Sequence, residues 1–216
     1  MAQFNMSATP APTYDQRLLL RQEALARRDR ATPAAREAWS RAIAVRLAQL
    51  PQLQEAQAIF TYVHFRSEVE TLGLIAAWLA AGKRVCVPLT IPAERRLAAY
   101  WITTPARDVA PGYCRIPEPD PQRTALANPK EIEIVILPGS VFDLSGGRLG
   151  YGGGFYDRFL ADQAPQALRV GLAFELQVTK RLPLLAHDQP LDLLVTEDRL
   201  LSFPRRDHVA QSKERP

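Results

Sequence analysis

The chain has 216 residues, of which 47% are hydrophobic, and a formal net charge of +4 at pH 7. This composition excludes an intrinsically disordered chain and supplies enough apolar residues for one sizeable core. The N-terminus lacks the basic and apolar regions of a signal peptide, and the most apolar helical run, residues 72–82, is about half as long as a bilayer requires. We therefore expect a cytoplasmic protein without a membrane partner.

Positive charge is concentrated near the N-terminus. Between Arg17 and Arg46 there are eight arginines and only three acidic residues. Such a segment is typical of a solvated helix face, but it could also bind a phosphate-rich ligand or a nucleic acid. All three interpretations are compatible with the sequence.

The first predicted helix begins at a capping-box pattern at residues 13–16 and runs to about residue 29. Arg17, Arg21 and Arg28 share one side of it, because offsets of four and eleven residues return to the same helix face.

The second predicted helix begins at Thr32, a typical N-cap residue, which is followed by Pro33 at the first helical position. Pro51 is expected to end it. An apolar stripe at helical spacing predicts a face packed on the core. The stripe consists of Trp39, Ile43, Leu47 and Leu50.

After the second helix the sequence alternates between apolar runs typical of strands and helical segments. The predicted strands are residues 58–65, 84–90, 97–103, 133–139, 168–174 and 191–197, and the predicted helices are 71–82 and 156–163. The proline-rich stretch 111–123 is expected to be a loop. This order predicts an α/β fold, with a mostly parallel or mixed central sheet flanked by helices and an N-terminal helical arm. We expect a single domain over residues 13–203, with flexible tails at 1–12 and 204–216.

Cysteine and histidine give no sign of a disulfide or of a zinc site. Cys86 lies in an apolar run, which predicts a buried and unreactive thiol, and Cys114 has no nearby partner in sequence. The three histidines are scattered without the spacing of metal ligands.

The stretch GGRLGYGGGFYDRFL, residues 146–160, lies between a predicted buried strand and a helix. Ligands of open α/β sheets bind at the carboxyl ends of strands, and glycines let the backbone approach an anion closely. Together with Arg148, the loop predicts a phosphate site, although a flexible turn would also tolerate the glycines. It matches neither common phosphate motif, because Phe155 and Tyr156 follow Gly154. Asp157 could favour the helix dipole or bind magnesium beside phosphates.

The same residues carry a resemblance to a known family. The pattern Phe142-Asp143-x-x-Gly146-x-Arg148-Leu149-Gly150-x-Gly152-x-Gly154-Phe155-Tyr156-Asp157 resembles the signature of 5-formyltetrahydrofolate cyclo-ligase, also called 5,10-methenyltetrahydrofolate synthetase. Shorter pieces match in order from about residue 17 to residue 197. They are Arg17-x-x-x-Arg21, Ser67-Glu68-Val69-Glu70-Thr71, Ile116-Pro117-Glu118-Pro119 and Asp192-Leu193-Leu194-Val195-Thr196-Glu197.

The resemblance implies an enzyme of one-carbon metabolism that uses ATP and Mg²⁺. Members of the family close the N5-formyl group of 5-formyltetrahydrofolate onto N10 and release ADP and phosphate. Phosphorylation of the formyl oxygen would make it a leaving group, and N10 would then attack the formyl carbon. Such chemistry requires the reacting groups to be aligned and their charge neutralised. The partners it implies are 5-formyltetrahydrofolate and ATP, with no nucleic acid, and we expect a monomer.

The resemblance also assigns roles to residues of this chain. Arg148 and Tyr156 are expected to be catalytic, and Asp157 and Asp192 to hold Mg²⁺. The residues expected to bind ATP are Arg17, Arg21, Arg148, Leu149, Gly150, Tyr151, Gly152, Gly153, Gly154, Phe155 and Tyr156. The residues expected to bind the folate are Phe65, Glu70, Tyr151, Gly152, Gly153, Gly154 and Phe155.

Each of the isolated assignments has a plainer structural alternative. Glu70 could serve the start of a helix, Phe65 could be core, Asp192 could be a surface acid at a strand end, and Arg17 and Arg21 could be solvated. Glu68 would point to the same side as Glu70 if the strand continued, and it receives no role. This chain also departs from the family pattern, with Phe155 in place of tyrosine and Arg115 in place of glycine.

Two other functions stay open. One is a nucleic-acid-binding module that uses the basic segment. The other is a non-catalytic or divergent relative that binds a phosphorylated metabolite on the same fold, since fold alone does not fix function.

Overall fold

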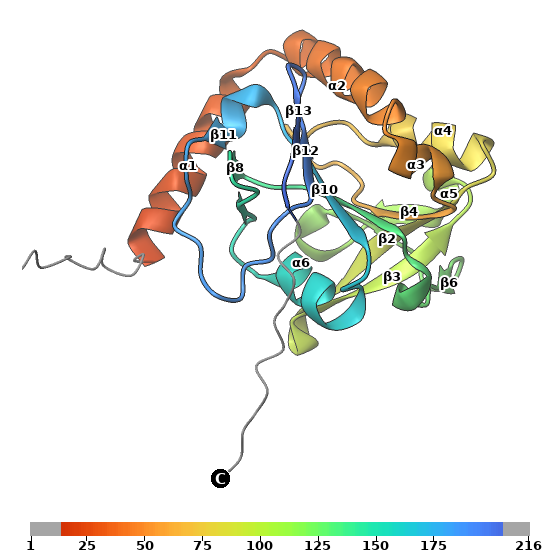
Figure 1. The fold of residues 1–216 in the computed structure, drawn as a ribbon. Coiled ribbons are helices and arrows are strands. Elements are labelled where there is room, and N and C mark those ends of the chain that lie inside the picture. Colours follow the sequence, from red (N-terminus) through yellow and green to blue (C-terminus); the bar gives the residue numbers. More distant parts are fainter. Residues whose placement is uncertain (1–13, 205–216) are drawn as a thin grey trace, which may run out of the picture.

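The computed structural model describes residues 14–204, which form a mixed eight-stranded sheet with helices on both faces (Figure 1). The strand order is β13-β12-β10-β7-β1-β2-β3-β6. Neighbours from β12 to β2 pair in parallel, whereas the outer strands pair antiparallel. The predicted mixed α/β sheet is thereby confirmed. The strands are β1 (Ala58–Thr61), β2 (Arg84–Ile91), β3 (Arg96–Ile102), β6 (Ala125–Leu126), β7 (Ile134–Leu137), β10 (Leu168–Leu172), β12 (Leu193–Val195) and β13 (Leu200–Ser202).

Helices α2, α3 and α4 lie together over one face of the sheet, and α6 lies on the other side (Figure 1). The helix α1 lies at the edge of the molecule, beside β8 and β11. The helices are α1 (Tyr14–Arg30), α2 (Pro33–Ala48), α3 (Pro51–Glu55), α4 (Leu72–Ala80), α5 (Pro105–Asp108) and α6 (Phe155–Arg158), which continues as a π-helical turn, Phe159–Gln163. Two small sheets complete the fold: β8 (Val141–Asp143) pairs with β9 (Arg148–Leu149) and β11 (Val178–Thr179), and β4 (Val109–Pro111) pairs with β5 (Pro117–Pro119).

The central strands are apolar throughout because both faces of the sheet are covered. In β7, Ile134 and Ile136 pack toward α2 and α4, whereas Val135 and Leu137 pack toward the segment that contains Phe159. Successive side chains of a strand point to opposite faces, so each of the four is buried. The near-continuous apolar run at 133–139 predicted this arrangement correctly.

The start of α2 follows the predicted cap. The Thr32 side chain accepts a hydrogen bond from the Ala35 N–H at 3.2 Å, and Pro33 occupies the first turn. Replacing Thr32 by alanine leaves that N–H without its acceptor, so we expect a loss of about 1 kcal/mol in the free energy of unfolding. Urea denaturation of the T32A and T32S variants checks this, since serine retains the hydroxyl. Equal stability of all three proteins would contradict the cap assignment.

The prediction of a loop over residues 111–123 was wrong in part. Strands β4 and β5 form a short hairpin there, with Ala110 opposite Glu118 and Pro111 opposite Pro117. The turn is closed by the Gly112 N–H and the Ile116 carbonyl at 2.8 Å. Because ladder hydrogen bonds alternate along an antiparallel pair, the prolines occupy positions where no N–H is required.

Other predicted boundaries shift by a few residues. The strand expected over 58–65 ends at Thr61, and Pro51 opens α3 as well as following α2. The predicted tails and the capping-box residue Thr13 lie outside the described residues, apart from Pro204. Within residues 14–204, no helix combines the length and apolarity needed to cross a membrane.

Candidate active site at the glycine-rich loop

A cavity of about 450 Å³ opens where the sheet changes its winding direction. The chain passes from β1 to β2 on one side, and from β7 to β10 on the other. The segments that follow β1 and β7 therefore separate and leave a crevice at the carboxyl ends of these strands, which is where α/β proteins bind ligands. The segment after β1 contributes Tyr62, Phe65 and Glu68, the glycine-rich loop contributes Arg148, Gly150, Tyr151, Gly153, Gly154, Phe155, Tyr156 and Asp157, and the β4–β5 hairpin contributes Tyr113, Cys114 and Glu118.

The glycine-rich loop connects β9 to α6. Gly152 and Gly154 have φ values of +106° and +65°, which side-chain-bearing residues rarely adopt. A β-carbon at Gly153 would lie 2.6 Å from the Phe155 ring. The path of this loop therefore depends on these three glycines. Residues 151–153 are exposed, and Tyr151 and Gly153 line the cavity.

Arg148 and Asp157 form an ion pair at the cavity wall, with 3.0 Å between Nη2 and Oδ1. Arg148 is held further by the Pro138 carbonyl at 3.1 Å, and its guanidinium lies 5.7 Å from the centre of the Tyr156 ring. Oδ1 of Asp157 also accepts the N–H of Gln189 at 3.1 Å. Oδ1 of Asp157 thus accepts from both Arg148 and Gln189, and the Asp157 side chain lines the cavity.

A buried carboxylate, Glu68, lies on the wall formed by the segment after β1. Its Oε2 accepts the Phe65 N–H and its Oε1 accepts the Tyr151 hydroxyl, both at 2.9 Å. Burial raises the pKa of Glu68, although the Phe65 N–H, the charge of Arg28 and the Tyr151 hydroxyl oppose that rise. Glu68 was given no role from the sequence, yet it lies at the cavity.

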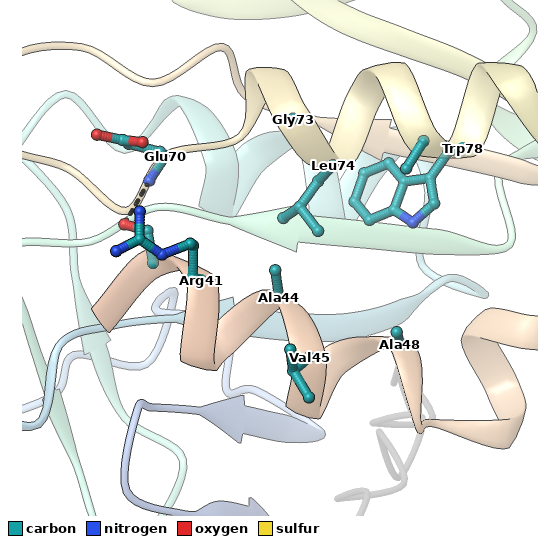
Figure 2. Close-up of a pocket in the computed structure, with 10 residues that line it drawn as sticks. Arg41, Ala44, Val45, Ala48, Glu70, Gly73, Leu74 and Trp78 are labelled. Atoms are coloured by element: carbon teal, nitrogen blue, oxygen red, sulfur yellow. Dashed lines mark hydrogen bonds between the residues drawn. The ribbon is translucent and has the colours of Figure 1, made fainter. Parts of the chain in front are cut away.

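Glu70, which the resemblance implied as a folate ligand, lies elsewhere. It is exposed and lines a separate groove of about 440 Å³ between α2 and α4, where its N–H donates to the Ser40 hydroxyl at 3.1 Å (Figure 2). Figure 2 shows Glu70 and Arg41 at one end of this groove and Trp78 at the other. The residues after Thr61 leave the strand conformation, so Glu68 and Glu70 do not share a side.

Phe65 lines the cavity, as the resemblance implied, with the Arg66 guanidinium 5.0 Å from the centre of its ring. On the opposite side, Cys114 and Arg115 both adopt positive φ, +55° and +64°. The position that is glycine in the family pattern therefore has a backbone conformation that glycine adopts without strain.

Three arginines of α1, Arg17, Arg21 and Arg28, are buried rather than solvated. Arg21 donates from Nε to the Gly150 carbonyl at 2.8 Å, which ties α1 to the glycine-rich loop. Arg17 makes a two-pronged contact with Asp188, at 2.5 and 2.9 Å, and does not line the cavity. Burial alone would raise the pKa of Asp188, but its hydrogen bonds from Arg17 and the Leu185 N–H hold it below the ordinary value.

Asp192 does not line the cavity. Its Oδ2 accepts the N–H of Arg169 at 2.8 Å, and its own N–H donates to the Arg169 carbonyl at 2.9 Å. Within the part of the chain that the structure describes, no group of three or more acidic, histidine or cysteine side chains is arranged to hold a metal ion. Asp157 is thus the predicted metal ligand that lies at the cavity.

Comparison with known proteins places this architecture in one family. A curated 5-formyltetrahydrofolate cyclo-ligase from Escherichia coli is 30% identical over 175 residues, which cover 81% of this chain and 96% of that protein. Another, from Haemophilus influenzae, is 32% identical over 148 residues, covering 68% and 79%.

Solved structures show the same fold. The 5,10-methenyltetrahydrofolate synthetase of Aquifex aeolicus superimposes with a TM-score of 0.77 at 28% identity, covering 92% of this chain and 98% of that one. The synthetase of Mycoplasma pneumoniae, at 21% identity, shares the fold with a TM-score of 0.68, covering 84% and 98%. Residues 14–197 match the sequence model of the 5-formyltetrahydrofolate cyclo-ligase family, and the chain belongs to that family.

Proposed function

We propose that the protein converts 5-formyltetrahydrofolate to 5,10-methenyltetrahydrofolate in an ATP- and Mg²⁺-dependent reaction that releases ADP and phosphate. The observation that carries this proposal is that one cavity has two chemically different walls. One wall is the glycine-rich loop with Arg148 and Asp157, and the other holds Phe65 and the buried carboxylate of Glu68. The first wall suits a polyphosphate, and the second suits an aromatic ring system that bears N–H donors.

For ATP, we propose that the backbone from Arg148 to Tyr156 surrounds the phosphates. Arg148 supplies positive charge there, and Arg21 fixes the loop through the Gly150 carbonyl. Arg17 acts on the phosphate site only indirectly. It binds Asp188, which precedes Gln189 in the chain, and the Gln189 N–H donates to Asp157.

For the folate, we propose that Glu68 accepts hydrogen bonds from the amino and ring N–H groups of the pterin, and that Phe65 packs against it. Glu68 takes the role that the sequence suggested for Glu70, since Glu70 lines another groove. The middle of the glycine-rich loop, residues 151–155, would contact the formyl end.

The residues present fit a magnesium ion bound together with the nucleotide. Mg²⁺ takes one or two carboxylates and completes its shell with water and phosphate oxygens, so Asp157 beside the phosphate loop is sufficient. When bound, the ion neutralises charge on the phosphates. Asp157 lines the cavity and Asp192 does not, so Asp157 is the ligand that we propose.

In the proposed reaction the formyl oxygen attacks the γ-phosphorus of ATP, and the bond to ADP breaks. N10 then attacks the activated formyl carbon, the carbon–oxygen bond breaks to release phosphate, and N10 loses its proton. The protein aligns these groups and stabilises their charge. Arg148 offsets the negative charge that is transferred. Burial raises the pKa of Tyr156, which keeps its hydroxyl neutral and able to donate a hydrogen bond to the reacting oxygens.

Three of the eight arginines of the basic segment do not contribute to a basic surface. Arg17, Arg21 and Arg28 are each less than a tenth exposed and bind protein oxygens.

The proposal is tested by mixing the purified protein with 5-formyltetrahydrofolate, ATP and Mg²⁺ and following the near-ultraviolet absorbance of the methenyl product. We expect product only when all three are present. Binding of ATP without any methenyl product would instead favour a divergent relative that binds a phosphorylated metabolite.

A further inference from the structure

Arg28, in the last turns of α1, is 2% exposed and joins three segments that line or support the cavity. Its Nε donates to the Ser67 hydroxyl at 3.0 Å, its Nη1 to the Gly139 carbonyl at 3.4 Å, and its Nη2 to the Tyr151 hydroxyl at 3.0 Å. Ser67 lies after β1, Gly139 lies after β7, and Tyr151 belongs to the glycine-rich loop. The proposed function gives this arginine no task.

All three partners are uncharged oxygens, and no carboxylate of the described residues forms a salt bridge with Arg28. A buried cation is costly unless a negative charge lies near. Arg28 reaches two carboxylates through one hydroxyl group each: the exposed Asp29 through Ser67, and the buried Glu68 through Tyr151.

The chemistry of the three groups fixes the direction of both hydrogen bonds. A guanidinium has only donors, so the Tyr151 hydroxyl must accept from Arg28. The single proton of that hydroxyl then goes to Oε1 of Glu68, at 2.9 Å. Oε2 of Glu68 receives the Phe65 N–H, so each carboxylate oxygen has one fixed protein donor and retains a lone pair toward the cavity.

We propose that Arg28 is a positioning residue for the cyclo-ligase reaction, which acts through the Tyr151 hydroxyl to hold the Glu68 carboxylate in place for the folate. This role rests on the proposed function. It also links the two walls of the cavity, because Tyr151 belongs to the glycine-rich loop whereas Glu68 belongs to the opposite wall.

The Phe65 N–H, the charge of Arg28 and the Tyr151 hydroxyl all favour the charged form of Glu68. The titratable groups that face Glu68 are Arg28 from α1, Tyr62 after β1, Tyr151 from the glycine-rich loop and Tyr156 from α6. Burial raises the pKa of all three tyrosines, which therefore stay neutral, so Arg28 is the cation of the set. Loss of Arg28 or of the Tyr151 hydroxyl removes an effect that lowers the pKa of Glu68. Less of the carboxylate form would then be present at a given pH.

The test compares the Tyr151→Phe and Arg28→Gln variants with wild type and with an Arg27→Gln control. Arg27 lies next to Arg28 in the same helix, but its side chain is exposed and donates only to the Leu176 carbonyl. The dissociation constant of 5-formyltetrahydrofolate is measured by calorimetry between about pH 5 and pH 8, together with kcat and the melting temperature. In parallel, the carboxyl carbon of Glu68 is titrated by NMR in the ligand-free proteins.

We expect Tyr151→Phe and Arg28→Gln each to weaken folate binding about tenfold, since a hydrogen bond to a charged group is lost. In both variants, the pH below which folate binding weakens and the midpoint of the NMR titration of Glu68 should move to higher pH. Arg27→Gln should match wild type in both measurements. In a Glu68→Gln background, adding Tyr151→Phe should have little further effect.

The inference is overturned if Tyr151→Phe binds the folate with wild-type affinity and pH dependence, or lowers only the melting temperature. If the Arg28→Gln variant does not fold, Tyr151→Phe alone tests the proposal, because it removes one hydroxyl group and keeps the aromatic ring. Failure of the proposed function is distinct, since wild type would then bind no 5-formyltetrahydrofolate although the NMR titration still shifts between variants.

Discussion

Replacing Asp157 by asparagine is expected to lower kcat by roughly 100- to 1,000-fold while the fold is retained. Asparagine has nearly the same shape, and its carbonyl oxygen can still accept from Arg148 and from the Gln189 N–H, as Oδ1 does. The negative charge that attracts magnesium is lost, however. Steady-state rates over a range of Mg²⁺ concentrations, with circular dichroism of the same samples, check the effect.

Asp162 provides the matched control for this variant. It is an exposed carboxylate in the helical turn that follows α6, away from the residues that line the cavity. We expect Asp162→Asn to have wild-type turnover and wild-type dependence on Mg²⁺. Wild-type turnover in Asp157→Asn would remove Asp157 from the proposed metal site.

Replacing Glu68 by glutamine is expected to raise the KM for 5-formyltetrahydrofolate by about tenfold or more, because a carboxylate that accepts from the pterin becomes a neutral amide. Glu70→Gln should change that KM by less than about twofold, since Glu70 lines the groove between α2 and α4. The comparison uses initial rates at saturating ATP. A larger rise in this KM for Glu70→Gln than for Glu68→Gln would instead assign the folate contact to Glu70.

Much of the sheet could be predicted from the sequence because its signals are local. The apolar run at β7 is long enough to mark a strand that is buried on both faces, and Thr32 with Pro33 marks a helix start. The position of the glycine-rich loop between a strand and a helix was also predicted. These features depend on neighbours within a few residues.

The hairpin that carries Arg148 was missed because hydrogen bonds from the backbone to one buried side chain hold it. The buried carboxylate of Asp143 accepts the N–H groups of Ser145, Gly147 and Leu182, at 2.7 to 2.8 Å. These bonds orient β8 and β9 and place the Arg148 side chain at the cavity wall. The hydrophobic pattern of a sequence does not predict such hydrogen bonds between the backbone and a side chain.

The resemblance pointed to Glu70 as the folate ligand, whereas the structure places Glu68 at the cavity and Glu70 at another groove. A continued strand would have put both acids on one side, but β1 ends at Thr61 and Arg66 has a φ of +56°. A left-handed residue changes the direction of the chain, so the side chains that follow no longer alternate as in a strand. Spacing alone therefore could not assign the acid to the cavity.

The arginines of α1 also show that residue spacing does not predict tertiary contacts. Helical spacing correctly put Arg17, Arg21 and Arg28 on one face, and all three are buried. It could not show that Arg17 meets Asp188, 171 positions away, or that Arg28 meets the glycine-rich loop. What a helix face contacts depends on tertiary packing.

The most direct test of the account follows the formyl oxygen itself. 5-Formyltetrahydrofolate labelled with ¹⁸O in the formyl group is converted by the protein with ATP and Mg²⁺, and the released phosphate is analysed by mass spectrometry alongside the methenyl product. The proposed reaction predicts equal amounts of phosphate and methenyl product, with the label in the phosphate. Unlabelled phosphate, or phosphate released without methenyl product, would contradict it.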